Sequence, residues 1–308
     1  MLSWTSSSIH RVRLPARASS GAIWITSLRG RNVAAVSGAT ARELQGLTRE
    51  ALAVAAATRF TPQQATQALY ALASAGQSAA EQMATLTPVL NLAEAAQADL
   101  GTTTELMTGT LAQFRLEADQ ATRVADVFTA SIGASSLNVD RLAVAFRNAG
   151  PTAAALGQSL EGTTASLAIL TSAFNNGERA GTGFRAILNE LPKLATELGV
   201  NIYDASGQMR PFADVVQLLE ERGLTAASAV RMLGAEAGPA MAAFLSEGSN
   251  ALREMESRLQ SAGQAAAVAA SQIDTLQGTL DTLGSAIELA MVSIGDASSG
   301  MVGRVAGN

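Results

Sequence analysis

Residues 252–294 read LREMESRLQSAGQAAAVAASQIDTLQGTLDTLGSAIELAMVSI, and apolar side chains recur along them at alternating steps of three and four residues. Steps that average about 3.5 residues keep one face of a slightly under-wound α-helix turned toward a partner over its whole length. The spacing therefore predicts a long C-terminal coiled-coil-like helix with a partner-binding seam. The seam consists of Leu252, Met255, Leu259, Ile273, Leu276, Leu280, Leu283, Ile287 and Ile294, with Ala262, Ala266, Ala269 and Ala290 between them.

The partner of this seam can be another copy of the chain or the chain itself. An unbroken helix of this length would extend about 65 Å at roughly 1.5 Å per residue, so its main property is reach. The heptad positions e and g flank the apolar seam, and in this segment they carry almost no charge. Electrostatic attraction between paired helices would therefore specify their register and copy number poorly. Self-association through the seam and folding of the seam onto the protein's own helices are therefore both kept as hypotheses.

The composition predicts helices that cannot stand alone. Hydrophobic residues make up 48% of the 308 residues, alanine dominates them, and only 4% of residues are aromatic. Such segments have high helix propensity but bury little apolar area each, so they need neighbours. No uncharged apolar run approaches the roughly 20 residues that cross a bilayer. The absence of cysteine excludes disulfides and thiolate metal ligands, and is typical of a protein that folds in a reducing cytoplasm.

The body of the chain is expected to be mainly α, as an irregular multi-helix array. A small polar residue followed three residues later by Glu or Gln is the capping-box pattern of a helix start. Three such pairs predict helix starts: Thr61 with Gln64, Ser78 with Glu81, and Thr102 with Glu105. Apolar residues at helical spacing follow each of them.

One segment departs from the helical spacing. Residues 200–203 alternate as Val-Asn-Ile-Tyr, residues 204–207 have turn composition, and Pro211 follows shortly after. This order predicts one small β-hairpin near 200–210. A two-stranded hairpin is marginal alone, so a role as connector between two helices is at least as well supported as a binding role.

Charge is unevenly distributed along the chain. Residues 1–42 contain six arginines and no carboxylate, so the net charge of −5 is the sum of +6 there and −11 in the rest. We interpret this segment as a disordered or mis-assigned basic leader, with a mitochondrial transit peptide as the alternative. The expected domains are the leader at 1–42, a helical core domain at 43–248 that includes the hairpin, a long heptad helix at 249–295, and a flexible tail at 296–308.

The sequence lacks the combinations of residues that usually carry out catalysis. The sole histidine, His10, lies in the leader, so the body cannot supply a Ser-His-Asp or Cys-His arrangement. Gly177 and Gly181 have phosphate-loop spacing, but no lysine follows them. Asp119 and Asp126 are interpreted as an ordinary solvated helix face. We expect no enzymatic activity, no cofactor and no metal site.

Several segments, taken in order, resemble the core region of phage tail tape measure proteins. Residues 148–170 read NAGPTAAALGQSLEGTTASLAIL, residues 180–188 read AGTGFRAIL, and residues 233–240 read LGAEAGPA. The predicted hairpin lies between the last two, as in the family. The resemblance covers roughly residues 45–295. Leu233 stands where the family more often has an aromatic residue, which affects local packing only.

The resemblance implies a structural protein that acts as tape measure and scaffold and sets tail length during tail assembly. It implies self-association through the heptad helix, contacts with tail tube subunits and tail assembly chaperones, and no specific nucleic acid. The implied location is the virion tail, with the bacterial cytoplasm during assembly, and a prophage gene is expected.

Two alternative functions are kept. One is a membrane-active helical protein that aids DNA delivery, with membrane contact only during ejection. The other is a coiled-coil interaction module. Because family members commonly continue beyond this core, we also expect a truncated copy, a fragment or an unusually short member.

Overall fold

A computed structural model describes residues 33, 35–36, 38–260, 263–273, 282–286 and 289. The described part is mainly helical and contains no β-strand, which confirms the predicted mainly α class. The named elements are α3 (Ala41–Ala57), α4 (Pro62–Ser74), α5 (Ala79–Ala95), α6 (Leu100–Phe114), the 3₁₀ turn η1 (Ala118–Gln120), α7 (Ala121–Ala134), α8 (Val139–Ala155), α9 (Leu160–Phe174), α10 (Gly177–Leu198), α11 (Phe212–Glu221), α12 (Ala226–Glu247), α13 (Ser249–Leu259) and α14 (Gln264–Ile273).

Side-chain caps decide where several helices begin. Thr61 and Gln64 form a reciprocal capping box at α4, and Ser78 and Glu81 form another at α5, as predicted. The third predicted cap, Thr102, is wrong by three residues. Asp99 caps α6 by accepting the backbone N–H of Thr102 at 2.8 Å, so the helix begins at Leu100. A carboxylate one turn earlier takes the capping role because it complements the partial positive charge of the helix N-terminus.

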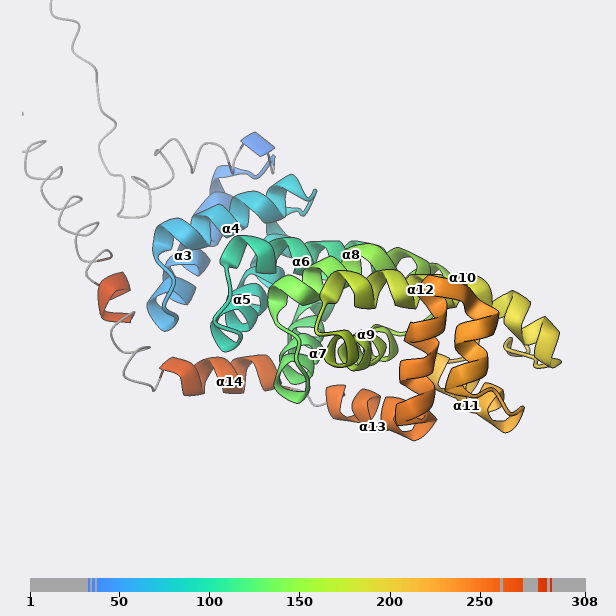
Figure 1. Cartoon of the computed structure of the whole chain (residues 1–308). Helices are drawn as coiled ribbons and strands as arrows, with labels where there is room; N and C mark the ends of the chain where they lie inside the picture. Colours follow the sequence, from blue (N-terminus) through green and yellow to red (C-terminus); the bar gives the residue numbers. More distant parts are fainter. Residues whose placement is uncertain are drawn as a thin grey trace, which may run out of the picture.

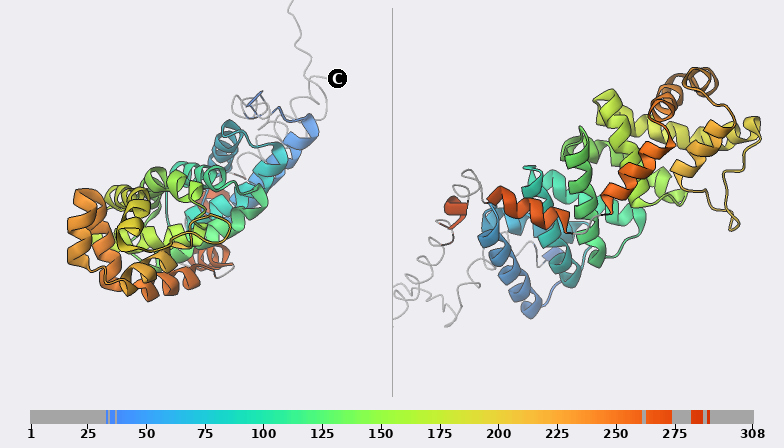
Figure 2. Two further views of the ribbon diagram at one scale, coloured as in Figure 1. Left: turned by 90° about the vertical axis from the view of Figure 1, so that its right-hand side faces the viewer. Right: turned by 90° about the horizontal axis from the view of Figure 1, so that it is seen from below.

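The helices form an elongated array, and the C-terminal helices fold back along it. Figure 1 shows the chain passing from α3 and α4 at one end to α10, α11 and α12 at the other. Helices α13 and α14 then run back along one side of the array, and both views in Figure 2 show the same course. One continuous apolar cluster joins helices from α3 to α14. The C-terminal helices therefore contact elements that lie far from them in sequence.

Helix α9 lies at the centre of this array. It contacts α7, α8, α10, α12 and α13, and most of its side chains are buried. Five phenylalanines of the other helices pack in two clusters. Phe128 packs edge-on against Phe146 with ring centroids 5.1 Å apart, and the second cluster joins Phe184, Phe212 and Phe244.

Two glycines let α8 and α10 approach each other closely. A Cβ added at Gly177 would lie 2.3 Å from the carbonyl oxygen of Arg141, and one added at Gly181 would lie 2.6 Å from that of Ala145. Real Cβ atoms do not approach backbone that closely. The two glycines noted for their phosphate-loop spacing therefore serve helix packing. This contact explains Gly181, the first glycine of the AGTGF stretch.

The predicted β-hairpin is wrong. Residues 200–210 form a loop closed by a single isolated antiparallel bridge between Tyr203 and Met209. Its turn is held by Asp204, whose Oδ1 accepts the hydroxyl of Ser206 at 2.6 Å and the backbone N–H of Gln208 at 3.0 Å. The end of the loop is held by Gln158, whose amide donates to the carbonyl of Arg210 at 3.1 Å and accepts the backbone N–H of Phe212 at 2.8 Å.

The prediction of one long C-terminal helix is also wrong within the described residues. Helix α13 ends at Leu259, Gly263 has a φ of +78°, and α14 begins at Gln264. A left-handed residue cannot continue a right-handed helix. The heptad period predicts a continuous helix from local spacing alone. In the structure, contacts with helices that are distant in sequence favour a break in this helix. Most of residues 274–294 lie outside the described part.

The domain boundaries stay predictions. Most of the leader at 1–42 and all of the tail at 296–308 lie outside the described residues. Helix α13 packs on α7, α9, α11 and α12, all within the predicted core domain. The segment predicted as a separate helix at 249–295 therefore shares its core with residues 43–248 in the part that the structure describes.

Substitution of Gly181 by alanine tests the close contact between α8 and α10. We expect Gly181→Ala to lower the free energy of unfolding by about 1–3 kcal/mol, because the new methyl group overlaps the backbone of Ala145. Gly133 in α7 has open space at its Cβ position, so Gly133→Ala is the matched control and should raise stability by up to about 1 kcal/mol. Urea denaturation measures both, and equal effects would contradict the packing argument.

Candidate functional site

The candidate site is the strap, defined as helices α13 (Ser249–Leu259) and α14 (Gln264–Ile273). Helix α13 packs on α9, α7 and α11, and α14 packs on α5 and α7. Leu252 and Leu259 are 2% and 1% exposed, and Met255 is half-buried against the same core. These three seam residues thus face the protein's own helices, as the folding-back hypothesis expects.

The buried face of α14 differs in part from the predicted seam. In α14, Ala265 and Ala269 are buried, while the predicted seam residue Ala266 is exposed. A continuous seam would place Ala266 and Ala269 on one face together with Leu259. Helix α14 therefore keeps the seam residue Ala269 buried but buries Ala265 in place of Ala266.

The remaining predicted seam residues are not brought together by the described structure. Ile273 is the last residue of α14. Leu283 lies in the short described segment 282–286 and is 56% exposed. The other four lie outside the described residues, namely Leu276, Leu280, Ile287 and Ile294. Their role in partner binding stays a prediction.

Helix α13 is capped at its start by a carboxylate from α11. Glu220 accepts the backbone N–H of Ser249 at 3.1 Å and its hydroxyl at 2.7 Å. The residue at the cap position itself is Gly248, which has no side chain to do this. A negative charge here complements the unpaired N–H groups and the positive end of the helix dipole.

Helix α14 is capped in the same way by a carboxylate from α7. Asp126 accepts the backbone N–H of Gly263 through Oδ2 at 2.7 Å and that of Ala265 through Oδ1 at 2.8 Å. Asp126 is 5% exposed, so the interpretation of this residue as part of a solvated face is wrong. Asp119 does lie on an exposed face. No signal in the sequence identifies Asp126, because its partner lies 137 residues away.

A second group of polar contacts fastens α13 along its length. Arg253 pairs with Asp214 of α11 at 2.8 Å and also bonds Gln217. On the other side, the hydroxyl of Ser159 donates to Glu256 at 3.2 Å. These contacts join α13 to the two helices between which it lies.

The pKa of Glu256 is raised above the ordinary value of 4.5. Burial between α13 and α9 is the main cause, since it disfavours the charged form, and the nearby carboxylates of Glu161 and Asp214 act in the same direction. The Ser159 hydroxyl and the Arg253 guanidinium oppose the shift. The strap therefore carries a carboxyl group that loses favourable solvation when it docks.

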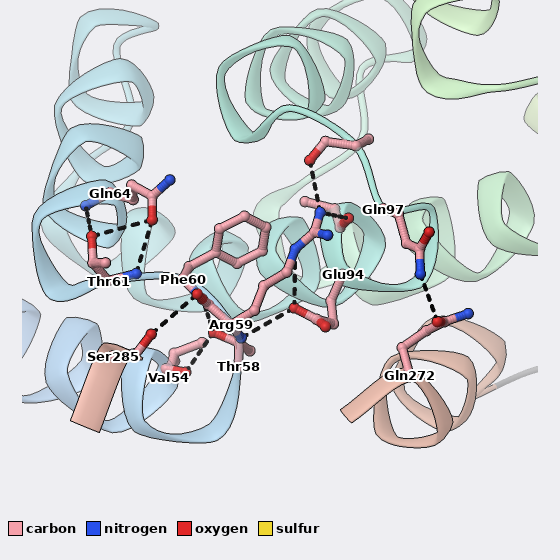
Figure 3. Close-up of polar contacts among 12 residues, drawn as sticks. Val54, Thr58, Arg59, Phe60, Thr61, Gln64, Glu94, Gln97, Gln272 and Ser285 are labelled. Carbon is pink, nitrogen blue, oxygen red and sulfur yellow. Dashed lines mark hydrogen bonds and ion pairs between the residues drawn. The ribbon is translucent and has the colours of Figure 1, made fainter. Parts of the chain in front are cut away.

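Segments from both ends of the sequence meet near α3 and α4. Figure 3 shows Arg59, whose guanidinium donates to the carbonyls of Ala93 and Ala98 and pairs with Glu94 at 3.5 Å. The hydroxyl of Ser285 donates to the carbonyl of Arg59 at 3.1 Å.

Beside this junction, α14 contacts the end of α5. The side chain of Gln97 donates to Gln272 at 2.8 Å, and Figure 3 shows the two facing each other. The far end of the strap is thus tied to the first third of the chain.

The described residues offer little for chemistry. They contain no group of three His, Cys, Asp or Glu side chains that could hold a metal ion. An open depression of about 780 Å³ lies between the ends of α6 and α8 and the 200–210 loop, and Arg115 is the one charged side chain in its described lining. This depression lacks the paired acid and base that hydrolysis needs. Among the described helices, none is both long and apolar enough to cross a membrane.

Comparison with known proteins identifies the family. The family model described as "Phage-related minor tail protein" matches residues 48–235. The "Tape measure protein" of Pneumococcus phage Dp-1 is 34% identical over 270 residues, which cover 83% of this chain and 24% of that protein. The "Probable tape measure protein" of Escherichia phage P2 is 30% identical over 142 residues, which cover 44% and 17%. No solved structure gives a significant match.

The chain therefore belongs to the phage-related minor tail protein family. The resemblance to tape measure proteins that the sequence predicted is confirmed. The chain spans about a quarter or less of the length of these curated relatives. Within it, the family model ends at residue 235, before the strap begins.

The raised pKa of Glu256 predicts how stability changes with pH. A carboxyl group whose pKa is higher in the folded protein stabilises the fold fully below its unfolded pKa, and this contribution is lost as the pH rises through the folded value. We therefore expect Glu256→Gln to be more stable than the native protein at pH 7, because the amide keeps the oxygen that accepts from Ser159 without the buried charge. The two proteins should converge well below pH 4.5. Urea denaturation at both pH values measures the difference.

The control for this prediction is Glu254→Gln on the exposed side of the same helix. Glu254 pairs with Arg258 at the surface, where both side chains are more than half exposed. Exposed pairs contribute little, so this change should have a small effect at either pH. A stability difference for Glu256→Gln that is the same at both pH values would contradict the argument.

Proposed function

We propose that this chain is a structural tape measure and scaffold of a phage tail, and that it takes part in setting tail length during assembly. The observation that carries the proposal is the identity to two tape measure proteins, one of them along 83% of the chain. The arrangement of the described residues supports it, because α-helices pack along an elongated array.

A helix is a suitable ruler because each residue adds a fixed rise of about 1.5 Å. The described array does not use its residues in that way throughout, since α13 and α14 run back along helices that precede them. The strap adds little length while it is docked. We therefore assign scaffold and folding roles to the array at 41–247, and a length-setting role to residues that carry the heptad period.

The partners and location follow from this role. The proposed partners are tail tube subunits, tail assembly chaperones and other copies of this chain, with self-association through the heptad segment. Membership of a tail protein family indicates the virion tail as the final location, and assembly in the bacterial cytoplasm is part of the proposal. Membrane contact during DNA ejection and a separate role as a coiled-coil interaction module stay predictions.

Deletion of whole heptads tests the proposal in a phage that carries this chain in its tail protein. Removal of residues 274–294 keeps the heptad phase and spares Leu252 and Leu259, which the core needs. We expect tails shorter by up to about 32 Å, from 21 residues at roughly 1.5 Å each. Electron microscopy of purified virions measures tail length.

The control is a substitution within the same segment that keeps its length. Leu283→Ala removes an exposed side chain and should leave tail length unchanged. This control separates an effect of length from an effect of sequence. Deletion tails as long as those of the parent phage would refute the proposal.

A further inference from the structure

A groove runs along α6 and α8. It consists of two depressions, of about 780 Å³ and about 230 Å³, which adjoin at Gln113 because this residue lines both. We call the two together the α6–α8 groove. We propose that this groove binds a short acidic peptide segment of a partner protein, and that Arg115 recognises the carboxylates of that segment. The inference rests on the proposed function, because a tail scaffold needs partners, and it adds a surface and the chemistry of what binds there.

The walls of the groove are fixed by the fold. Helices α6 and α8 pack on each other, and Figure 1 shows them on the side of the array opposite α13 and α14. The docked strap therefore does not cover the groove. The remaining wall is the 200–210 loop, which is held by the amide of Gln158, and Gln158 itself is 5% exposed. A preformed wall of this kind loses little conformational freedom when a ligand binds.

The charge of the groove is positive at one end. Arg115 is exposed and is the one charged side chain in the described lining of the larger depression. Arg147 is exposed in the smaller depression, and neither arginine takes part in an ion pair with another described residue. Glu105 lines the smaller depression as well. Guanidinium groups bind carboxylates through two parallel hydrogen bonds, so the groove complements acidic groups near Arg115.

The backbone of Arg115 is unusual for an arginine. It caps the C-terminus of α6 in the left-handed conformation, with φ of +53° and ψ of +42°. Glycine is favoured at such a position, because a Cβ makes this conformation costly. The fold alone would therefore select glycine here. A strained residue that also lines a groove is a candidate for a binding role.

The floor of the groove contains polar atoms without partners. Three other threonines of α6 donate their hydroxyl groups to the carbonyl one turn earlier. Thr110 is 1% exposed, and its hydroxyl finds no hydrogen-bond partner among the described residues. The Oε1 atom of Gln113 is also buried and unpaired, in space that Gly150 leaves open, because a Cβ at Gly150 would lie 2.0 Å from it. Buried polar groups are nearly always paired, so this floor suits a ligand with both donors and acceptors, such as a peptide backbone.

The size and apolar lining of the groove also suit a peptide. The part of α6 from Glu105 to Arg115 is about 15 Å long at roughly 1.5 Å per residue, which about five residues of an extended peptide would span. Beside Arg115, the lining includes Tyr203, which is 38% exposed, and the half-buried Phe114. These rings can cover apolar side chains that flank a carboxylate.

Nucleic acid fits the groove less well than a peptide. Residues 43–308 carry a net charge of −11, which opposes a ligand with one negative charge at every unit. A short segment with a few carboxylates interacts mainly with the arginines beside it, because salt screens the more distant charges. An acidic peptide is therefore the favoured occupant.

Substitutions of Arg115 separate binding from stability. Arg115→Gly removes the guanidinium and relieves the left-handed strain, so we expect the affinity for an acidic peptide to fall about tenfold while the folding equilibrium constant rises about threefold. Arg115→Gln removes the charge but keeps a Cβ. It should lose the same affinity without the gain in stability. A purely structural role of Arg115 would move binding and stability in the same direction.

Two further variants complete the set. Arg147→Gln should lower the affinity by a smaller factor, about threefold, because an exposed charge contributes less. Arg231→Gln is the matched control, since Arg231 is exposed on α12, takes part in no ion pair with a described residue and does not line the groove. The control should bind as the native chain does.

The measurement uses the full chain and fluorescence anisotropy. The probe is a fluorescein-labelled peptide of about eight residues that alternates glutamate and leucine, which is longer than the span of α6 in the groove. A second peptide of the same length alternates glutamine and leucine, and an oligothymidylate of similar length represents nucleic acid. We expect the native chain to prefer the glutamate peptide, and this preference should weaken at high salt. Urea unfolding followed by circular dichroism measures the stability of each variant.

Four results would overturn the inference. The first is equal affinity of the native chain for the glutamate and glutamine peptides, and the second is no binding of either. The third is native affinity for the glutamate peptide in both Arg115 variants. The fourth is tighter binding of the oligothymidylate than of the glutamate peptide, which would assign the groove to nucleic acid instead.

The groove and the proposed function fail independently. Peptide binding is measured on the purified chain, whereas the proposed function is measured as tail length in virions. A groove that does not select the glutamate peptide refutes the inference, even if heptad deletions shorten tails. Unchanged tails after heptad deletion refute the tape measure role, even if the groove binds acidic peptides.

Discussion

The structure depends on the small apolar area that each of its helices carries. Alanine-rich helices gain little from burying one face, so they must pack on several sides and approach closely. Gly177 and Gly181 allow this approach between α8 and α10, and α9 is enclosed by helices on almost every side. Phe128 packs on Phe146 in one aromatic cluster, and Phe212 packs on Phe244 in another.

The return of the strap along this array follows from the same constraint. Leu252 and Leu259 are among the larger apolar side chains near the C-terminal end, and the nearest apolar surface belongs to earlier helices of the same chain. Reversal creates helix ends with unpaired N–H groups. Glu220 and Asp126 satisfy these groups from outside the strap. Carboxylates spread along the sequence thus become parts of one docking surface.

Local patterns in the sequence predicted some elements well and others poorly. The capping boxes at Thr61 and Ser78 involve neighbours three residues apart, and both were confirmed. The hairpin near 200–210 was wrong, because alternation over four residues is a weak signal and no second strand extends the single bridge. The role of Asp126 could not be predicted, since a buried capping carboxylate looks like any surface aspartate until its partner is placed.

The sequence by itself determined the helical class, the small number of residues suited to catalysis, the heptad period and the resemblance to tape measure proteins. These properties depend on composition, spacing and the order of short motifs, all of which are local. Only the tertiary structure decided where the heptad helix breaks, which face of α14 is buried and which residues cap it. A seam at a given period specifies that a helix needs an apolar neighbour, but the choice of neighbour depends on competition between surfaces that fold together. Here the turn at Gly263 and the carboxylate of Asp126 favour the chain's own helices.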